Sequence, residues 1–229
     1  PPALQRRDSV STDGLVHERV KVSEEETGSV LVFRPGAGEV RRLDNALRAL
    51  DLGRDVIVAP LYGQLDSAAQ DRAIQPAPAG RRKLVLATSI AETSLTIEGI
   101  RVVVDAGLMR QPRFDANTGL TRLATLPVSQ AAADQRCGRA GRLQAGVCYR
   151  LWPRHQHLLA HSAPEIFDAD LAPLVLELAH WGVQDATQLR WLDSPPAAHL
   201  AQATELLQQL GALDGAARIT GHGRAMLQL

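Results

Sequence analysis

The residues best suited to chemistry are two arginines in the segment Gln135–Arg142, which reads QRCGRAGR. Arg139 and Arg142 are three residues apart, so on a helix they lie on adjacent faces of one turn. Gly138 and Gly141 leave the backbone open to close approach by a partner. A guanidinium donates two hydrogen bonds to phosphate and keeps its charge. From these residues alone two interpretations stand, a grip on a triphosphate and an exposed basic helix.

A second polar segment follows one of several apolar runs. Four such runs predict buried strands: Ser29–Phe33, Val56–Pro60, Lys83–Thr88 and Val102–Asp105. Nearly continuous apolar strands separated by helical or loop segments indicate an α/β fold with a parallel sheet covered by helices on both faces. Ligands of such sheets bind at the carboxyl ends of the strands. We expect Thr88–Ser94 and Asp105–Gly107 at those ends.

The segments between and after these strands carry other periodicities. Helical spacing of apolar residues predicts helices over Glu39–Leu50 and near Ser67–Ile74. Alternation on either side of Ala116–Gly119 predicts a hairpin between Gly107 and Pro127.

Beyond Trp152–Pro153 the pattern is helical. Helices are predicted over Leu171–Trp181 and Ala197–Leu210, and Gly182 and Gly211 end them. The tail, 217–224, predicts a small wing followed by another helix. We therefore divide the chain into a poorly packed lead-in (1–28), an α/β domain (29–155) and a mainly helical domain (162–229).

Composition narrows the function classes. Aromatic residues make up only 3% of the chain, which argues against recognition by extensive base stacking. The net charge is zero, yet residues 1–152 are basic in balance and 153–229 acidic, so an anionic ligand is expected on the first part. The cysteines, Cys137 and Cys148, are too few for a disulfide framework and too widely spaced for a zinc site. Because no apolar run reaches about 20 residues, no membrane span is expected.

Two motifs resemble those of a known family. QRCGRAGR resembles motif VI of superfamily 2 helicases, QxxGRxGR. Ala87–Ile97, which reads ATSIAETSLTI, resembles motif V of the DEAH-box RNA helicases, with Ser89 where the family usually carries asparagine. The sequence is thus similar to DEAH-box helicases over roughly 29–150.

Weaker resemblances occur in the same order along the chain. They are Leu31–Glu39 to motif IV, with Arg34 at a position that is commonly small or apolar; Leu61–Leu65 to the LYGxL turn; Arg72–Pro78 to the segment that covers the adenine; and Val104–Asp105 to the strand before the family's hairpin. Thr118–Leu123 and Cys148–Trp152 resemble the bacterial HrpB type. Asp170–Leu174, Trp181–Gly182 and Leu210–Leu213 resemble the winged helix that follows in this family.

The resemblance implies a fold and a set of roles. The fold would be a second RecA-like motor domain followed by a winged-helix-like domain. Arg139 and Arg142 would be arginine fingers, and Gln135 would lie near the attacking water. The implied nucleotide contacts are Ile74, Thr96, Glu98 and Gly138. The implied contacts to the RNA backbone are Thr88, Ser89, Arg34 and Gly63.

The resemblance also implies partners. ATP and Mg²⁺ would be used, but the G-x-x-x-x-G-K-[ST] loop and the DExH element that hold them do not occur in this sequence. They are expected in a first motor domain preceding residue 1. The expected function is half of a cytoplasmic, ATP-dependent RNA helicase that moves 3′→5′ on single-stranded or structured RNA and has no contact with a membrane. The alternative is a non-catalytic module that binds nucleic acid or another protein.

Overall fold

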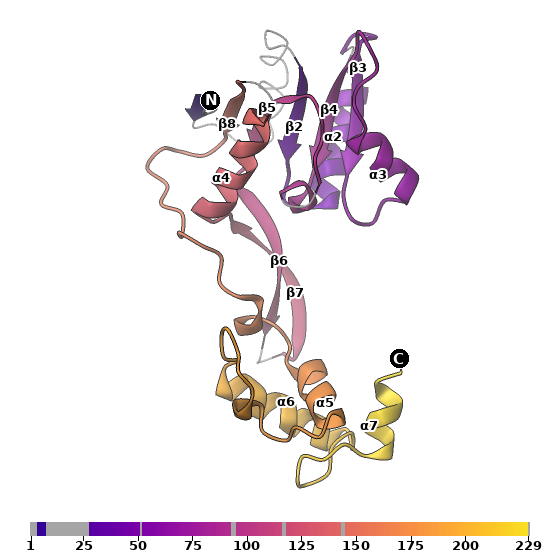
Figure 1. The fold of residues 1–229 in the computed structure, drawn as a ribbon, viewed down its shortest axis with the longest axis vertical. Helices are drawn as coiled ribbons and strands as arrows, with labels where there is room; N and C mark the ends of the chain where they lie inside the picture. The colour runs from indigo at the N-terminus through magenta and orange to yellow at the C-terminus, as the bar shows by residue number, and fades with distance from the viewer. Residues whose placement is uncertain are drawn as a thin grey trace. The chain divides into compact units, whose positions relative to one another are not determined.

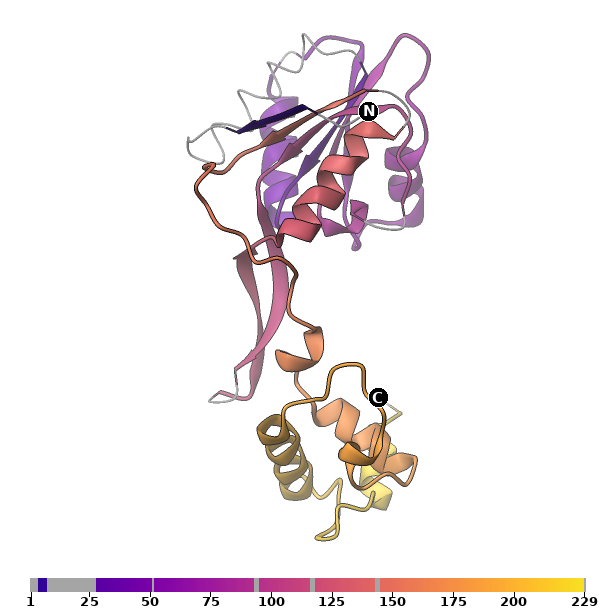
Figure 2. The same cartoon turned by 60° about the vertical axis from the view of Figure 1, so that its left-hand side comes forward.

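The computed structural model describes residues 4–7, 28–50, 52–92, 95–115, 118–142 and 145–228. It forms two compact units, drawn in Figures 1 and 2. The first comprises Pro1–Arg110 with Thr125–Ser162, and the second comprises Gln111–Ala124 with Ala163–Leu229. Each unit is described by itself below.

The first unit is built on a sheet of six parallel strands in the order β1-β8-β5-β2-β4-β3 (Figure 1). Their bounds are β1 Leu4–Arg7, β2 Ser29–Phe33, β3 Val56–Leu61, β4 Arg82–Ala87, β5 Ile100–Asp105 and β8 Val147–Arg150. The four predicted strands are therefore present, and β1 and β8 extend the sheet. Because β1 lies within the predicted lead-in, that segment contributes a strand; the rest of the lead-in up to residue 27 lies outside the described residues.

The alternation of side chains along β2 explains why both faces of the sheet are covered. Val30 and Val32 belong to the core beneath helix α2 (Ala37–Arg48), while Leu31 and Phe33 belong to the core on the other face. All five residues of β2 are buried. A strand covered on both faces reads as a continuous apolar run, which is the pattern seen in the sequence.

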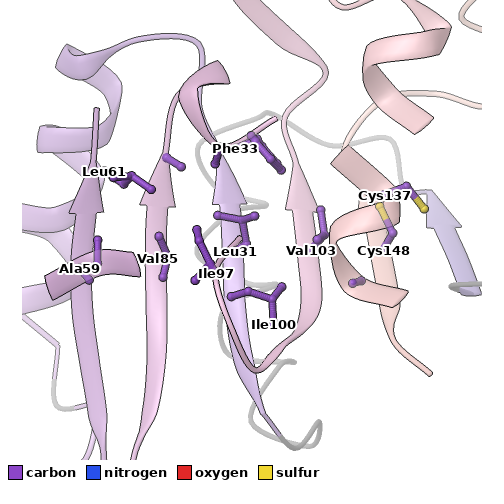
Figure 3. Packing of buried hydrophobic residues seen from close by; sticks show 14 residues of the cluster. Leu31, Phe33, Ala59, Leu61, Val85, Ile97, Ile100, Val103, Cys137 and Cys148 are labelled. Atoms are coloured by element: carbon purple, nitrogen blue, oxygen red, sulfur yellow. The ribbon is translucent and has the colours of Figure 1, made fainter. Parts of the chain in front are cut away.

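The face opposite α2 carries the elements of interest. These are α3 (Ser67–Ile74), the short turn η1 (Ser89–Ala91), α4 (Gln130–Gly138) and the 3₁₀ turn η2 (Arg139–Gly141). Helix α4 lies over this face of the sheet (Figure 2). Figure 3 shows the core beneath them, with Leu31, Val85 and Val103 on neighbouring strands and the free thiols of Cys137 and Cys148 at one end.

A hairpin of β6 (Leu108–Asp115) and β7 (Leu120–Pro127) follows β5, as predicted. Gly107 makes the turn into it with a φ of +71°, and a Cβ there would lie 2.5 Å from the Trp152 ring. Only glycine meets both requirements without strain. The base of the hairpin belongs to the first unit, and residues 111–124 belong to the second.

The second unit is mainly helical. It contains η3 (Glu165–Phe167), α5 (Ala172–His180), η4 (Ala186–Gln188), α6 (Ala197–Gln209) and α7 (Gly221–Met226). Its core joins α5 to α6 through Leu176, Ala203 and Leu207. Where the sequence predicted a small wing followed by a helix, the described residues show an antiparallel bridge between Leu213 and Ile219, and α7 follows it. No helix among residues for which a placement is given is long and apolar enough to cross a membrane.

Candidate functional site

Helix α4 carries the first of the candidate residues. It starts at Ser129, whose hydroxyl accepts a hydrogen bond from the Ala132 amide at 3.2 Å and caps the helix. It ends at Gly138, and the chain continues as the 3₁₀ turn η2. Glycine is about 1 kcal/mol poorer than alanine in a helix, so Gly138 favours this early end.

The placement of the two arginines on adjacent faces of one α-helical turn is therefore wrong. Arg139 and Arg142 follow α4, at the start and just past the end of η2. Side chains three residues apart eclipse each other on a 3₁₀ turn. The two guanidinium groups consequently share a face.

Both guanidinium groups contact the loop between β4 and β5. Arg139 donates from Nη1 to the Leu95 carbonyl at 2.9 Å and from Nη2 to the Glu92 carbonyl. Arg142 donates from Nη1 to Thr96 Oγ1 at 2.7 Å. Thr96, predicted to contact the nucleotide, is thus held beside one of the two predicted arginine fingers.

The positive charges of Arg139 and Arg142 repel each other. Burial, and next the positive charge of Arg142, lower the pKa of Arg139, and Glu92 partly offsets both effects. Arg142 is exposed. Two like charges held on one face are stabilised when an anion binds between them, because it removes their repulsion.

Gln135 and Gly138 lie on the exposed side of α4. A Cβ placed on Gly138 would meet no atom of the described residues within 4 Å. Packing inside the unit therefore does not require glycine at this position. The open backbone leaves room for close approach by a ligand or another domain.

The other predicted nucleotide contacts lie at the amino ends of the strands. Glu98 is exposed directly before Gly99, whose carbonyl accepts a hydrogen bond from the Ser29 amide at the start of β2. Ile74 ends α3 and is partly buried against the core of this face. Lys83, near the start of β4, donates to the carbonyls of Arg72 and Gln75 on either side of Ile74.

The predicted RNA contacts lie at the opposite, carboxyl ends of the strands. Phe33, Ala87 and Leu61 are in register at the carboxyl ends of their strands, so Arg34, Thr88 and Gly63 follow there. The Arg34 amide donates to the Ala87 carbonyl at 2.7 Å, and the Thr88 amide donates to the Leu61 carbonyl at 3.2 Å.

Ser89 and Gly63 are exposed at this carboxyl edge, and Arg34 is buried. The sequence pattern predicted ligands only at the carboxyl ends of the strands. In the structure Ile74 and Glu98 lie near the amino ends of the strands, and the predicted RNA contacts lie at the carboxyl ends.

A buried arginine at the carboxyl ends of β2 and β5 was not predicted. Arg136 is fully buried and bonded to two carboxylates, with Nε 2.7 Å from Glu92 Oε1 and Nη1 2.8 Å from Asp105 Oδ1. Its guanidinium also lies 4.9 Å from the centre of the Phe33 ring. Burial opposes the charge of Arg136, but Asp105 and Glu92 outweigh it and raise its pKa. The sequence offered one signal, the three-residue spacing of Arg136, Arg139 and Arg142.

Comparisons with known proteins agree with this architecture. Residues 13–144 match the family model described as the helicase conserved C-terminal domain. The chain belongs to this helicase family. It is 49% identical over its whole length to the ATP-dependent RNA helicase HrpB of Escherichia coli K12, of which it spans 28%.

Solved structures give the same result for the fold of this helicase domain. A crystal structure of the E. coli DEAH/RHA helicase HrpB matches 99% of the chain with a TM-score of 0.92 and 46% identity, covering 30% of that chain. A second, described as the E. coli DExH-box NTPase HrpB, matches 99% with a TM-score of 0.87 and 46% identity, covering 29%. The predicted fold class, a RecA-like parallel sheet followed by a mainly helical domain, is confirmed.

Proposed function

We propose that this chain is the second half of the motor of an ATP-dependent RNA helicase. The observation that carries the proposal is the like-charged pair Arg139 and Arg142, held on one face of η2 beside the open backbone of Gly138. Burial and the charge of Arg142 lower the pKa of Arg139, so a polyphosphate that binds both groups is favoured. The relative with 49% identity is itself an ATP-dependent RNA helicase.

In this proposal ATP is contacted by η2 and by residues near the amino ends of the strands. Arg139 and Arg142 act as arginine fingers that stabilise charge developing on the transferred phosphoryl group. Gln135 orients the attacking water. Thr96, Glu98 and Gly138 complete the contacts, and the half-buried Ile74 covers the base without a hydrogen bond to its edge.

The residues of this chain fit half of an ATP site. They supply cations and an apolar cover, and they include neither the phosphate-cradling lysine motif nor the DExH element. We assign those parts and Mg²⁺, which would neutralise phosphate charge, to a first motor domain of the same protein. Closure of the two domains brings Arg139 and Arg142 against the phosphates.

Residues at the carboxyl ends of the strands would contact RNA. Thr88 and Ser89 offer hydroxyl groups to phosphate, and the backbone near Arg34 and Gly63 adds further contacts. Ser89 reaches less far than the family's asparagine, so we assign most of the backbone grip to Thr88. Alternating closure on ATP would move the motor 3′→5′ along single-stranded or structured RNA. The two unpaired thiols suit the reducing cytoplasm, where we place the protein.

The test is ATP hydrolysis by the intact protein with and without single-stranded RNA. We expect RNA to stimulate phosphate release, because both motor domains bind it. Hydrolysis that does not respond to RNA would contradict the helicase proposal. Tight RNA binding with no hydrolysis would instead support the alternative, a non-catalytic binding module.

A further inference from the structure

The buried cluster around Arg136 lies at the carboxyl ends of β2 and β5, where Phe33 and Asp105 are in register, and it has no role in the proposal so far. Arg136 and Asp105 have side chains that are 0% exposed, and the Glu92 side chain is 12% exposed. The guanidinium also donates to the Leu108 carbonyl at 3.2 Å. Its donors are therefore directed at groups of the protein itself, and Arg136 does not serve as a third phosphate-binding arginine.

Glu92 connects this cluster to Arg139 through two different groups. Its carboxylate accepts from Nε and Nη2 of Arg136, and its main-chain carbonyl accepts from Nη2 of Arg139. Its own amide donates to the Ser89 carbonyl at 2.9 Å, which closes the turn η1. Glu92 thus has its side chain fixed by one arginine and its backbone bonded to the next.

We propose that Arg136 is a positioning residue for Arg139 and acts on it through Glu92. This inference rests on the proposed role of Arg139 as an arginine finger. A buried, doubly paired guanidinium is held in one orientation, since any other leaves a carboxylate without its partner in a medium of low dielectric constant. Arg136 therefore fixes Glu92, and the Glu92 carbonyl fixes the starting position of the Arg139 side chain.

Arginine is required at this position for a geometric reason. The planar fork reaches Glu92 and Asp105 at the same time, whereas the compact ammonium of lysine presents a single point charge. Arg136→Lys retains the buried positive charge but loses one of these connections. Glu92→Ala removes the link from the other side.

The first measurement is steady-state ATP hydrolysis by the intact protein in the presence of RNA. We expect Arg136→Lys and Glu92→Ala each to lower kcat by about tenfold to a hundredfold, while KM for ATP changes by less than about threefold, because a misplaced catalytic group affects the transition state more than binding. Asp134→Asn is the matched control. Asp134 lies on the same helix as Arg136 and forms an ion pair with buried Arg150 of β8. The substitution weakens this pair and leaves the Arg136 cluster intact, so kcat should stay within about twofold of wild type.

The decisive measurement combines each variant with Arg139→Ala. If Arg136 acts through Arg139, Arg136→Lys causes no further loss once Arg139 is alanine. Losses that multiply would overturn the inference, as would wild-type kcat in both single variants. If thermal unfolding shows that the Arg136→Lys variant is not folded, the combination of Glu92→Ala with Arg139→Ala tests the inference in the same way. An Arg139→Ala rate above half of wild type would refute the arginine-finger role itself, which is a separate result.

Discussion

Arg139 and Arg142 have similar surroundings but differ in how firmly they are held. Arg139 is half-buried and bonded to two carbonyls, while Arg142 is exposed and bonded to one hydroxyl. We predict that Arg139→Ala or Arg142→Ala in the intact protein lowers kcat by about 10³–10⁵ and changes KM for ATP far less. The reason is that an arginine finger acts on charge that exists only in the transition state. Steady-state kinetics with saturating RNA measures both parameters.

Arg48→Ala serves as the control for this prediction. Arg48 is an exposed arginine paired with Asp44 on α2, which covers the other face of the sheet. Its loss should leave both parameters near wild type. A finger variant that keeps more than half of the wild-type rate would remove Arg139 or Arg142 from the reaction.

Ile74 gives a second prediction, about nucleotide choice. Its side chain is apolar and partly packed into the core, so it can cover a base but cannot hydrogen bond to a base edge. Sites that pair no polar group reject analogues weakly. The intact protein should therefore hydrolyse ATP and GTP with kcat/KM values within about tenfold of each other. A larger preference for ATP would show that another residue reads the base.

Cys137 gives a prediction about pH. A hydrogen bond from Cys148 lowers the pKa of Cys137 to about 7, burial opposes this, and the charge of Arg150 adds to it. The unfolded thiol keeps its proton up to its ordinary pKa of 9.0, so the unfolded chain binds more protons between pH 7 and 9. The contribution of Cys137 to the free energy of unfolding is therefore fully present above pH 9 and is lost as the pH falls through 7.

Chemical denaturation at pH 6.5 and 8.5 tests this prediction. We expect Cys137→Ala to remove a gain of up to about 2 kcal/mol that the wild-type chain shows at the higher pH. The pKa of Cys148 is raised, chiefly by its hydrogen bond to Cys137 and by burial. Cys148 therefore changes the pH dependence of stability only above the ordinary pKa of a thiol. An equal pH response in both proteins would show that Cys137 does not ionise in this range.

At the scale of elements, the junction between β5 and β6 depends on one glycine. Gly107 combines a φ of +71° with a Cβ position 2.5 Å from the Trp152 ring. Gly107→Ala should lower the free energy of unfolding by about 2–4 kcal/mol, the sum of a left-handed backbone and an overpacked contact. Gly80→Ala separates the two effects, because Gly80 has a φ of +75° and no described atom within 4 Å.

Gly80→Ala should then cost about 1 kcal/mol. Thermal or chemical unfolding of both variants measures the difference. Equal losses would mean that the Trp152 ring moves aside and that only the backbone requires glycine.

The elements themselves could be predicted because their signals are local. The runs through Val30 and Val102 are apolar on both faces, and this alone places them in a covered sheet. Motif VI pointed to Arg139 and Arg142 for the same reason. The 3₁₀ turn that carries Arg139 was missed, because the cost of Gly138 in a helix is small beside the packing that decides where the helix ends.

The ion-pair cluster could not be predicted from the sequence. Arg136 meets Glu92 across 44 residues and Asp105 across 31. No periodicity encodes contacts at such separations, since they depend on which strands become neighbours. Arg136 lies on α4, which packs against β5, where Asp105 is the last residue, and Glu92 comes from the segment that follows β4.

At the scale of the whole molecule, each unit has a core of its own, so the chain as it stands is expected to fold. We predict that it binds single-stranded RNA weakly and hydrolyses no ATP. The named RNA contacts neutralise few phosphates, so affinity should fall by only about 0.7 log units per phosphate for each log unit of salt. Fluorescence titrations at several salt concentrations measure this slope.

Two outcomes would contradict this prediction. RNA-stimulated phosphate release above a buffer blank would show that the chain holds a complete ATP site. Nanomolar RNA binding at physiological salt would favour the non-catalytic binding module.

Glu98, a candidate nucleotide contact, and Thr88, a candidate RNA contact, lie near opposite ends of the strands, and a strand such as β5, Ile100–Asp105, spans about 20 Å at 3.3 Å per residue. If the proposed contacts hold, a nucleotide and an RNA strand bound to this unit would therefore not compete for the same atoms. Any influence between them is a coupling free energy, and coupling is reciprocal. If bound RNA tightens nucleotide binding by some factor, bound nucleotide must tighten RNA binding by the same factor.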